Sequence, residues 1–337
     1  MKRNVKVLAM LSSAIIVMGL FGGCASMPQE EKKPGVTEPV KKAEKVFVNI
    51  GTGGTAGTYF PLGGAFAEIW NNSIEGVNAT SQSTGASVAN INLLKDKKIE
   101  VAIVQNDVAW YTENGGEMFK DAKYADIRGL VTLYNEPLQI ITTDPSIKTI
   151  MDLKGKRIAV GAIGSGVEAN ARQIIAAAGL DFEKDIDAKF LSFAEASSGL
   201  KDKQVDVAFL TAGIPTAALQ DLGAQNKITV IPVDGAIAEK LMKDYKFFTK
   251  FTIPANTYNG QTADVQTLTV KAMLVVNADL DEDLAYKMVK TIYDNQARII
   301  AAHNVGKSIT KETALDGMSV TVHPGAAKYF KEQGISK

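Results

Sequence analysis

Two glycine-rich loops in this chain contain the residue types that bind small anions. Residues 51–59 and residues 161–166 each follow an expected strand and precede an expected helix, so both loops lie at a helix N-terminus. Backbone N–H groups are free at such a position, and the helix dipole favours negative charge there. The hydroxyls that reinforce these N–H groups belong to Thr52, Thr55, Thr58 and Ser165. The pattern predicts a site for a small anion, although the same glycines would also serve a tight turn.

The sequence gives less support for an enzyme than for a binding protein. Gly51, Gly53 and Ala56 fit the spacing of a dinucleotide-binding loop, but residues 77–84 lack the acidic residue that such a site requires. A nucleophile at Ser165 would need a nearby base, and the two histidines both lie beyond residue 300. Two histidines without a third ligand also do not make a zinc site. We therefore expect a binding protein with no cofactor and no metal, and treat an enzyme as the weaker alternative.

An internal repeat predicts how the loops are positioned. Residues 94–104 align with residues 200–210 at a constant offset of 106, with six identities in eleven positions. In each copy a helix leads into a buried strand that ends in a polar or small turn, at 105–107 and at 211–213. The match indicates two similar α/β lobes, with chance similarity between two helix-to-strand passages as the alternative.

Two apolar stretches are candidates for strands that cross between the lobes. Residues 138–143 and 268–276 are long enough to form such strands, and two crossings make a hinge. We expect lobe 1 to comprise residues 46–142 plus 272–337, and lobe 2 to comprise residues 143–271. Ligands of open α/β sheets bind beyond the carboxyl ends of the strands, so facing lobes would enclose a cleft.

Length and charge agree with a two-lobed binding protein. The chain has 337 residues, 46% of them hydrophobic, which favours two domains over one. Lysines and arginines number 37, as do aspartates and glutamates, but the first 45 residues are basic and the rest is mildly acidic. No cluster of basic and aromatic residues suggests nucleic-acid binding.

The N-terminal residues have the features of an export signal. Lys2, Arg3 and Lys6 precede an uncharged stretch that ends in two glycines and Cys24, the only cysteine. We expect residues 1–23 to be a lipoprotein signal peptide, Cys24 to carry the lipid that anchors the protein to a membrane, and residues 24–45 to be a flexible tether. An uncleaved membrane anchor and a free cysteine at an ordinary cleavage site are the alternatives.

Stretches along nearly the whole remaining chain resemble the TAXI group of solute-binding proteins, which serve tripartite ATP-independent periplasmic (TRAP) transporters. The matching stretches are GTGGTAGTYFPLGGAFAEIWN from Gly51, STGASVANINLL from Ser83, VAIVQND from Val101, LYNEPLQI from Leu133, DLKGKRIAVGAIGSGVEANARQIIAAAGL from Asp152, LSFAEASSGLKDKQVDVAFLTAGIPTAAL from Leu191 and VHPGAAKYF from Val322. The resemblance implies an α/β fold of the two-lobed type II periplasmic-binding-protein kind, located outside the cytoplasm. It also implies delivery of a small anionic organic ligand, such as glutamate, glutamine or a dicarboxylate, to TRAP permease membrane subunits.

The resemblance further implies a set of ligand-binding residues. They are Gly53, Gly54, Thr55, Tyr59, Thr84, Gly85, Gln105, Glu136, Gly164, Ser165 and Gly166. Glu136 is either a partner for a ligand ammonium group or half of a structural ion pair, and Tyr59 either covers the ligand or belongs to the core. The loops contain no arginine, so the ligand carboxylate would be held by N–H groups and hydroxyls. A lipid-anchored sensor that presents its ligand to a receptor is the alternative function.

Overall fold

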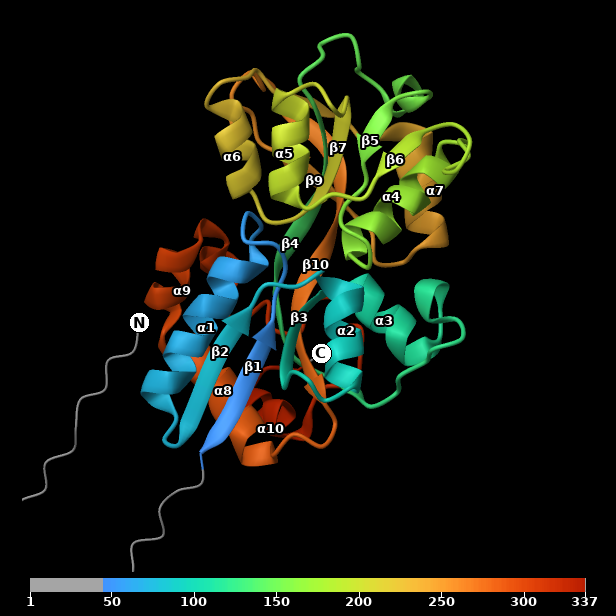
Figure 1. Ribbon diagram of the computed structural model, residues 1–337. Coiled ribbons are helices and arrows are strands. Elements are labelled where there is room, and N and C mark those ends of the chain that lie inside the picture. Colours follow the sequence, from blue (N-terminus) through green and yellow to red (C-terminus); the bar gives the residue numbers. More distant parts are fainter. Residues whose placement is uncertain (1–44, 337) are drawn as a thin grey trace, which may run out of the picture. The chain divides into compact units, whose positions relative to one another are not determined.

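One sheet of ten strands runs through residues 45–336, which are the residues that this computed structural model describes (Figure 1). Eight of the strands follow the order β2-β1-β3-β10-β4-β7-β5-β6, while β8 pairs with β4 and β9 with β10. The expected signal peptide, Cys24 and nearly all of the tether lie outside the described residues. No helix among the described residues has the length and apolar character needed to cross a membrane.

Lobe 1 is built on three parallel strands and the helices that cover them. Its elements are β1 (Val46–Gly51), α1 (Tyr59–Ser73), β2 (Val77–Gln82), α2 (Ser87–Lys95), β3 (Val101–Gln105), α3 (Asn106–Asn114) and the 3-10 turn η1 (Glu117–Phe119). Apolar residues of α1, including Leu62, Phe66 and Ile69, are buried against the sheet at the helical spacing expected from the sequence.

Lobe 2 repeats this arrangement. Its elements are η2 (Ile150–Leu153), β5 (Arg157–Ala159), α4 (Gly166–Ala177), β6 (Asp187–Lys189), α5 (Phe193–Lys201), β7 (Val207–Thr211), α6 (Ala217–Gly223), β8 (Thr229–Ile231), α7 (Gly235–Asp244) and β9 (Thr249–Ile253). β6, β5 and β7 are parallel and adjacent, just as β2, β1 and β3 are in lobe 1. Lys97 and Lys203, at equivalent positions of the sequence repeat, both have left-handed backbone, with φ of 54° and 55°.

Two long strands connect the lobes. β4 (Ile127–Thr142) and β10 (Val265–Asn277) pair antiparallel with each other and extend through both halves of the sheet (Figure 1). The expected crossing strands therefore exist, but β4 begins earlier than its apolar stretch suggested. Residues 138–142 pair with β7 and β8, two strands that follow the expected boundary at residue 142 in the chain.

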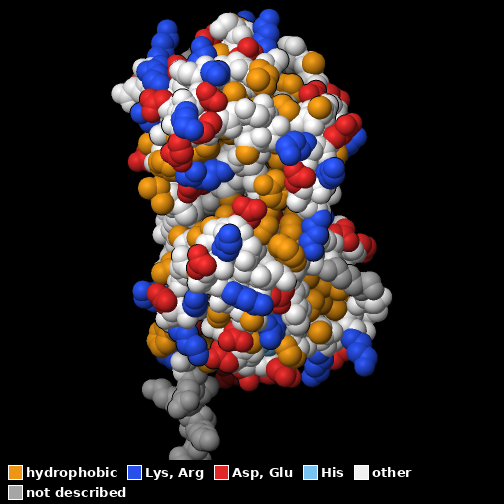
Figure 2. Space-filling view, turned by 90° about the vertical axis from the view of Figure 1, so that its right-hand side faces the viewer, with side chains coloured by type: hydrophobic (Ala, Val, Ile, Leu, Met, Phe, Trp, Pro, Cys, Tyr) orange, Lys and Arg blue, Asp and Glu red, His pale blue; other side chains and the backbone are white. Residues whose placement is uncertain are grey.

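The C-terminal segment returns to lobe 1. It comprises α8 (Glu282–Asp294), α9 (Gln296–Ala302), η3 (Asn304–Ser308) and α10 (Pro324–Glu332). Leu284, Met288 and Ile292 of α8 join the buried cluster around α1, as their spacing predicts, and Trp70 Nε1 donates to the Met288 carbonyl at 3.2 Å. His323 caps α10 by accepting a hydrogen bond from the Gly325 N–H at 3.2 Å. On the face shown in Figure 2, acidic and basic side chains are interspersed over both halves.

Candidate ligand-binding site

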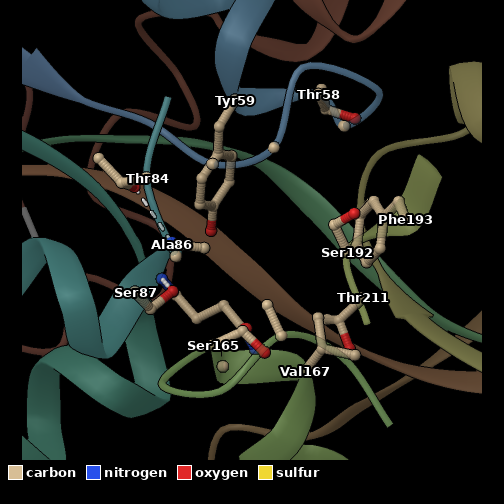
Figure 3. Close-up of a pocket in the computed structure, with 18 of the residues that line it drawn as sticks. Thr58, Tyr59, Thr84, Ala86, Ser87, Ser165, Val167, Ser192, Phe193 and Thr211 are labelled. Carbon is tan, nitrogen blue, oxygen red and sulfur yellow. Dashed lines mark hydrogen bonds between the residues drawn. The ribbon is translucent and has the colours of Figure 1, made fainter. Parts of the chain in front are cut away.

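A small cavity lies where the carboxyl ends of the parallel strands of both lobes meet. Its volume is about 80 Å³, several times the 10 to 15 Å³ that one water molecule needs. Figure 3 shows Tyr59, Ser87, Ser165 and Phe193 placed around it from different elements. The full lining is Gly53, Gly54, Gly57, Thr58, Tyr59, Thr84, Gly85, Ala86, Ser87, Gln105, Glu136, Ala162, Ser165, Gly166, Val167, Ser192, Phe193, Thr211 and Ala212.

Four helices begin at the cavity wall. Tyr59, Ser87, Gly166 and Phe193 are the first residues of α1, α2, α4 and α5, and all four line the cavity. The first N–H groups of a helix have no acceptor within the helix, so helix starts favour negative charge nearby. No lysine or arginine is among the lining residues, so the positive potential at this wall comes from backbone dipoles.

The two glycine loops present their helix starts differently. Ser165 caps α4: its Oγ accepts from the Glu168 N–H at 3.1 Å, while the Glu168 carboxylate accepts from the Gly164 N–H at 3.0 Å. Thr58 precedes α1 with helical backbone angles and makes no side-chain cap. The start of α1 is therefore open toward the cavity, whereas part of the α4 start is satisfied by its own side chains.

Glu136 places a buried carboxyl group at the cavity wall. It is 1% exposed and lies in β4 where that strand pairs with β10. The Tyr59 hydroxyl donates to Oε2 at 2.7 Å and the Tyr134 hydroxyl to Oε1 at 3.4 Å. Burial raises the pKa of Glu136 to about 8, although both hydroxyls partly oppose this shift. Among the described residues no cation pairs with Glu136, so the structural ion pair considered from the sequence is not found.

The lobes are closed around the cavity. The Gly164 carbonyl of lobe 2 accepts from Val88 N–H and Ala89 N–H of α2, both at 3.1 Å. The Ala56 carbonyl of the first glycine loop accepts from the Ala218 N–H of α6 at 3.2 Å. A carbonyl of each glycine loop therefore accepts hydrogen bonds from a helix start of the other lobe, and these bonds join the two lobes.

Most of the residues expected at a ligand site line this cavity. Those that do so are Gly53, Gly54, Tyr59, Thr84, Gly85, Gln105, Glu136, Ser165 and Gly166. Thr55 is exposed and does not line it, and Gly164 lines a neighbouring groove while its carbonyl bonds α2. Tyr59 is 8% exposed, packs in the core of lobe 1 and also lines the cavity.

The sequence repeat contained a signal for lining residues that were not predicted. Adding the offset of 106 to Ala86, Ser87 and Gln105 gives Ser192, Phe193 and Thr211. All six residues line the cavity. The repeat therefore relates lining positions in one lobe to lining positions in the other.

The fold and this site define a two-lobed α/β protein with a small cavity between its lobes. The chain belongs to the NMT1-like family, whose sequence pattern matches residues 50–334.

Solved structures with similar folds include a protein from Bordetella bronchiseptica RB50. It is 17% identical, with a TM-score of 0.51 over 86% of this chain and 90% of that one. The alkanesulfonate-binding protein SsuA from Xanthomonas axonopodis pv. citri, bound to MOPS, is 14% identical, with a TM-score of 0.42 over 86% of this chain and 85% of that one. A putative L-cystine ABC transporter protein from Listeria monocytogenes is also 14% identical, with a TM-score of 0.49 over 78% and 95%. The Bordetella structure shows a shared fold, and the predicted two-lobed α/β class is confirmed.

Proposed function

We propose that this protein captures a small organic acid outside the cytoplasm and delivers it to a membrane transporter. The observation that carries the proposal is the closed cavity between the lobes, lined by four helix starts and the carboxyl group of Glu136. A cavity of about 80 Å³ suits a small metabolite and excludes a peptide or a nucleotide in this closed form.

The helix starts support an acidic ligand. A carboxylate at the uncapped start of α1 would receive N–H donors without having to displace a protein side chain. The Ser87 hydroxyl lies at the same wall, whereas the hydroxyls of Thr84 and Thr211 donate within the protein, to Asn90 Oδ1 and Asn170 Oδ1. The lining contains no arginine or lysine. The free-energy cost of removing the ligand from water is therefore offset by several weak hydrogen bonds and not by one bidentate ion pair.

Glu136 supports an ammonium group on the same ligand. Its two partners are tyrosine hydroxyls, so the carboxylate has no countercharge when it ionises. A ligand ammonium would supply that charge and lower the pKa of Glu136. We therefore place glutamate-like and glutamine-like amino acids first and dicarboxylates second.

Lobe motion would give the ligand access. We propose lobes divided near residues 137–138 in β4 and 271–272 in β10, with these strands as the hinge. Supporting this, Leu138, Ile140, Leu268 and Val270 pack in the core of lobe 2, whereas Leu274 and Val276 pack in that of lobe 1.

The transporter is proposed to be of the TRAP type, because the resemblance to TAXI proteins extends along nearly the whole chain. The rival is an ABC-type system, the kind to which the Listeria protein is assigned. Deleting the gene for the TRAP permease that serves this protein should abolish uptake of the bound acid. Uptake that instead depends on ATP hydrolysis would replace TRAP with the ABC type, and unchanged uptake of every candidate acid would favour a sensor.

Membrane attachment is proposed to depend on Cys24. Replacing Cys24 by Ser should remove the lipid and release the protein from the membrane fraction. A Ser variant that still sediments with membranes would contradict the lipid anchor without touching the ligand proposal.

A thermal-shift screen of amino acids, dicarboxylates, keto acids and sugars tests the ligand class. Ligand at about 100 times its Kd stabilises the folded state by roughly 2.7 kcal/mol, which should raise the Tm by several degrees. Ligand carried through purification is first removed by partial unfolding. We expect glutamate-like acids to raise the Tm and sugars to leave it unchanged. A sugar giving the only shift would contradict the proposed ligand class.

A further inference from the structure

A buried polar cluster centred on Asn170 joins the two lobes beside the cavity. Asn170 lies in α4 of lobe 2 and is 0% exposed. Its Nδ2 donates to Asp107 Oδ2 at 2.9 Å, and its Oδ1 accepts from Gln105 Nε2 at 2.7 Å. Asp107 and Gln105 belong to lobe 1, at the start of α3 and the end of β3. One amide therefore binds two elements of the opposite lobe.

The remaining bonding positions of this amide are also occupied. Asn170 Nδ2 donates to Gln173 Oε1 at 3.3 Å, and Oδ1 accepts from the Thr211 hydroxyl at 3.1 Å. A primary amide has two donors and two acceptor positions, so all four are used. Removing one partner of a buried, satisfied network leaves the others without water or protein partners. The cluster should accordingly form or break as a unit when the lobes close or open.

The cluster is continuous with the ligand cavity through Gln105. The Gln105 side chain lines the cavity, and its Oε1 lies so near Gly166 that a Cβ there would be only 1.7 Å away. Its amide is thus fixed between the start of α4 and Asn170. A change in the position of Asn170 would therefore move the Gln105 amide at the cavity wall.

Aromatic side chains cover the cluster on its outer side. Trp110 and Tyr111 of α3 pack against Phe247 of lobe 2, with ring centroids 5.7 and 6.4 Å apart. The Lys246 ammonium lies 4.4 Å from the Trp110 ring centre, and Gln173 Nε2 donates to the Tyr111 hydroxyl at 3.1 Å. In Figure 1 this contact lies where α3 meets α4, and Figure 2 looks onto that side, where hydrophobic side chains gather between the halves. The cover keeps water from competing for the amide.

We infer that Asn170 is a positioning residue that latches the two lobes closed and thereby sets how long a ligand stays bound. The predicted effect of Asn170 on ligand residence time rests on the proposed function, whereas its predicted effect on lobe closure does not. The latch acts between the lobes and through Gln105, and Asn170 itself does not line the cavity.

Pulsed electron resonance distances between the lobes test the latch without any ligand. Spin labels are placed at exposed Lys95 of lobe 1 and exposed Gln225 of lobe 2, in the full-length chain with Cys24→Ser. Asn170→Asp opposes two carboxylates across the interface and should shift the ligand-free distances toward longer values. Adding Asp107→Asn restores a donor and acceptor pair in the reverse direction and should bring the short distance back.

Two further variants keep the test decisive if Asn170→Asp folds poorly. Thr211→Val removes a single donor and should produce a smaller shift in the same direction. Asn114→Leu, which removes an exposed amide at the end of α3, should leave the distances unchanged. Distances equal to those of the parent in both Asn170→Asp and Thr211→Val would overturn the latch.

Stopped-flow kinetics with L-glutamate as the probe give the second readout. A latch acts after capture, so Asn170→Asp should raise the dissociation rate at least tenfold and change the association rate less than threefold. A variant that is merely less stable would have a lower Tm without a selective increase in the dissociation rate. Equal changes in both rates would overturn the latch, while failure of the parent to bind L-glutamate would count against the proposed ligand and leave the distance experiment intact.

Discussion

The two glycine loops look alike in sequence but differ in how much of each helix start is left for a ligand. Both follow the first parallel strand of a lobe, and both precede a helix that begins at the cavity. Ser165 has extended backbone angles and caps α4, while Thr58 has helical angles and leaves α1 uncapped. A glycine loop before a helix therefore predicts where anions bind only when the residue before the helix leaves the N–H groups free.

The two lobes therefore contribute different groups to the cavity. Lobe 1 supplies the open helix start and the Glu136 carboxyl group, which suit the two ends of an amino acid. Lobe 2 supplies a capped loop whose Gly164 carbonyl accepts hydrogen bonds from α2 and whose Gly166 lies against the Gln105 side chain. Substitutions in each lobe test this difference.

The largest effect is expected for Gly166→Ala in lobe 2. A Cβ at this position would be 1.7 Å from Gln105 Oε1, so Gln105 must leave its place between the lobes. We expect ligand binding to weaken by about 100-fold, equivalent to roughly 3 kcal/mol. Titration calorimetry measures it, with Gly54→Ala as the matched control, because the nearest atom to a Cβ there is 3.9 Å away. Equal losses in the two variants would remove the distinction between the loops.

A pH-dependent effect is expected for Glu136 in lobe 1. Its pKa of about 8 means that it is mostly protonated below pH 7 and becomes charged as the pH rises through 8. Affinity for an amino acid should thus rise more than tenfold from pH 6 to pH 8, and binding should release a proton. Calorimetry in buffers of different ionisation enthalpy measures that proton. Glu136→Gln should abolish both effects, and a parent affinity that is flat over this range would contradict the ammonium site.

The same group makes a prediction for the stability of the ligand-free protein. Between the ordinary glutamate pKa of 4.5 and about 8, folded Glu136 holds a proton that the unfolded chain releases. The free energy of unfolding should fall as the pH rises through this interval, and Glu136→Gln should flatten the fall. Buried Asp107, whose pKa burial raises to about 6, adds a decrease below pH 6 that this variant retains. Urea unfolding at several pH values measures both.

A smaller effect separates the two helix caps. Ser165→Ala removes the hydroxyl that accepts from the Glu168 N–H and should lower the free energy of unfolding by about 1 kcal/mol. Thr58→Val removes no cap and keeps the volume of this buried side chain, and it should lower the free energy of unfolding by less, since the Thr58 hydroxyl lies 3.5 Å from the Gly213 carbonyl. Urea denaturation of the ligand-free variants compares them. The reverse order would mean that α1 is the capped helix in solution.

The smallest effect is expected at Arg172. This side chain is partly exposed, pairs with Glu168 and Glu183, and lies over the Phe182 ring, away from the cavity. Arg172→Gln should leave the ligand Kd within about twofold of the parent, since exposed ion pairs contribute little. A large loss of affinity would show that the ligand carboxylate reaches this arginine and that the backbone donors are insufficient.

Much of the fold follows from local patterns in the sequence. The helical spacing of Leu62, Phe66 and Ile69 indicates α1, and Gly179, a glycine with φ of 76°, lies just beyond the end of α4. The repeat at offset 106 correctly indicated two similar lobes. The first part of β4 was missed because Asn135, Glu136 and Pro137 interrupt the apolar pattern before residue 138; in the structure Asn135 is exposed and Glu136 is buried where β4 pairs with β10.

By itself the sequence determined the class of fold and the two glycine loops, because these depend on periodicity, glycine placement and strand ends, and the resemblance to TAXI proteins implied nine of the nineteen residues that line the cavity. Only the tertiary structure decided which helix start is open, that Glu136 faces two tyrosines instead of a cation, and that Asn170 bonds Gln105 and Asp107 across the lobes. The contacts of Asn170 with Thr211, Asp107 and Gln105, and of Glu136 with Tyr59, join residues 41 to 77 positions apart. No local pattern encodes such contacts, since they form only when the two halves of the sheet come together.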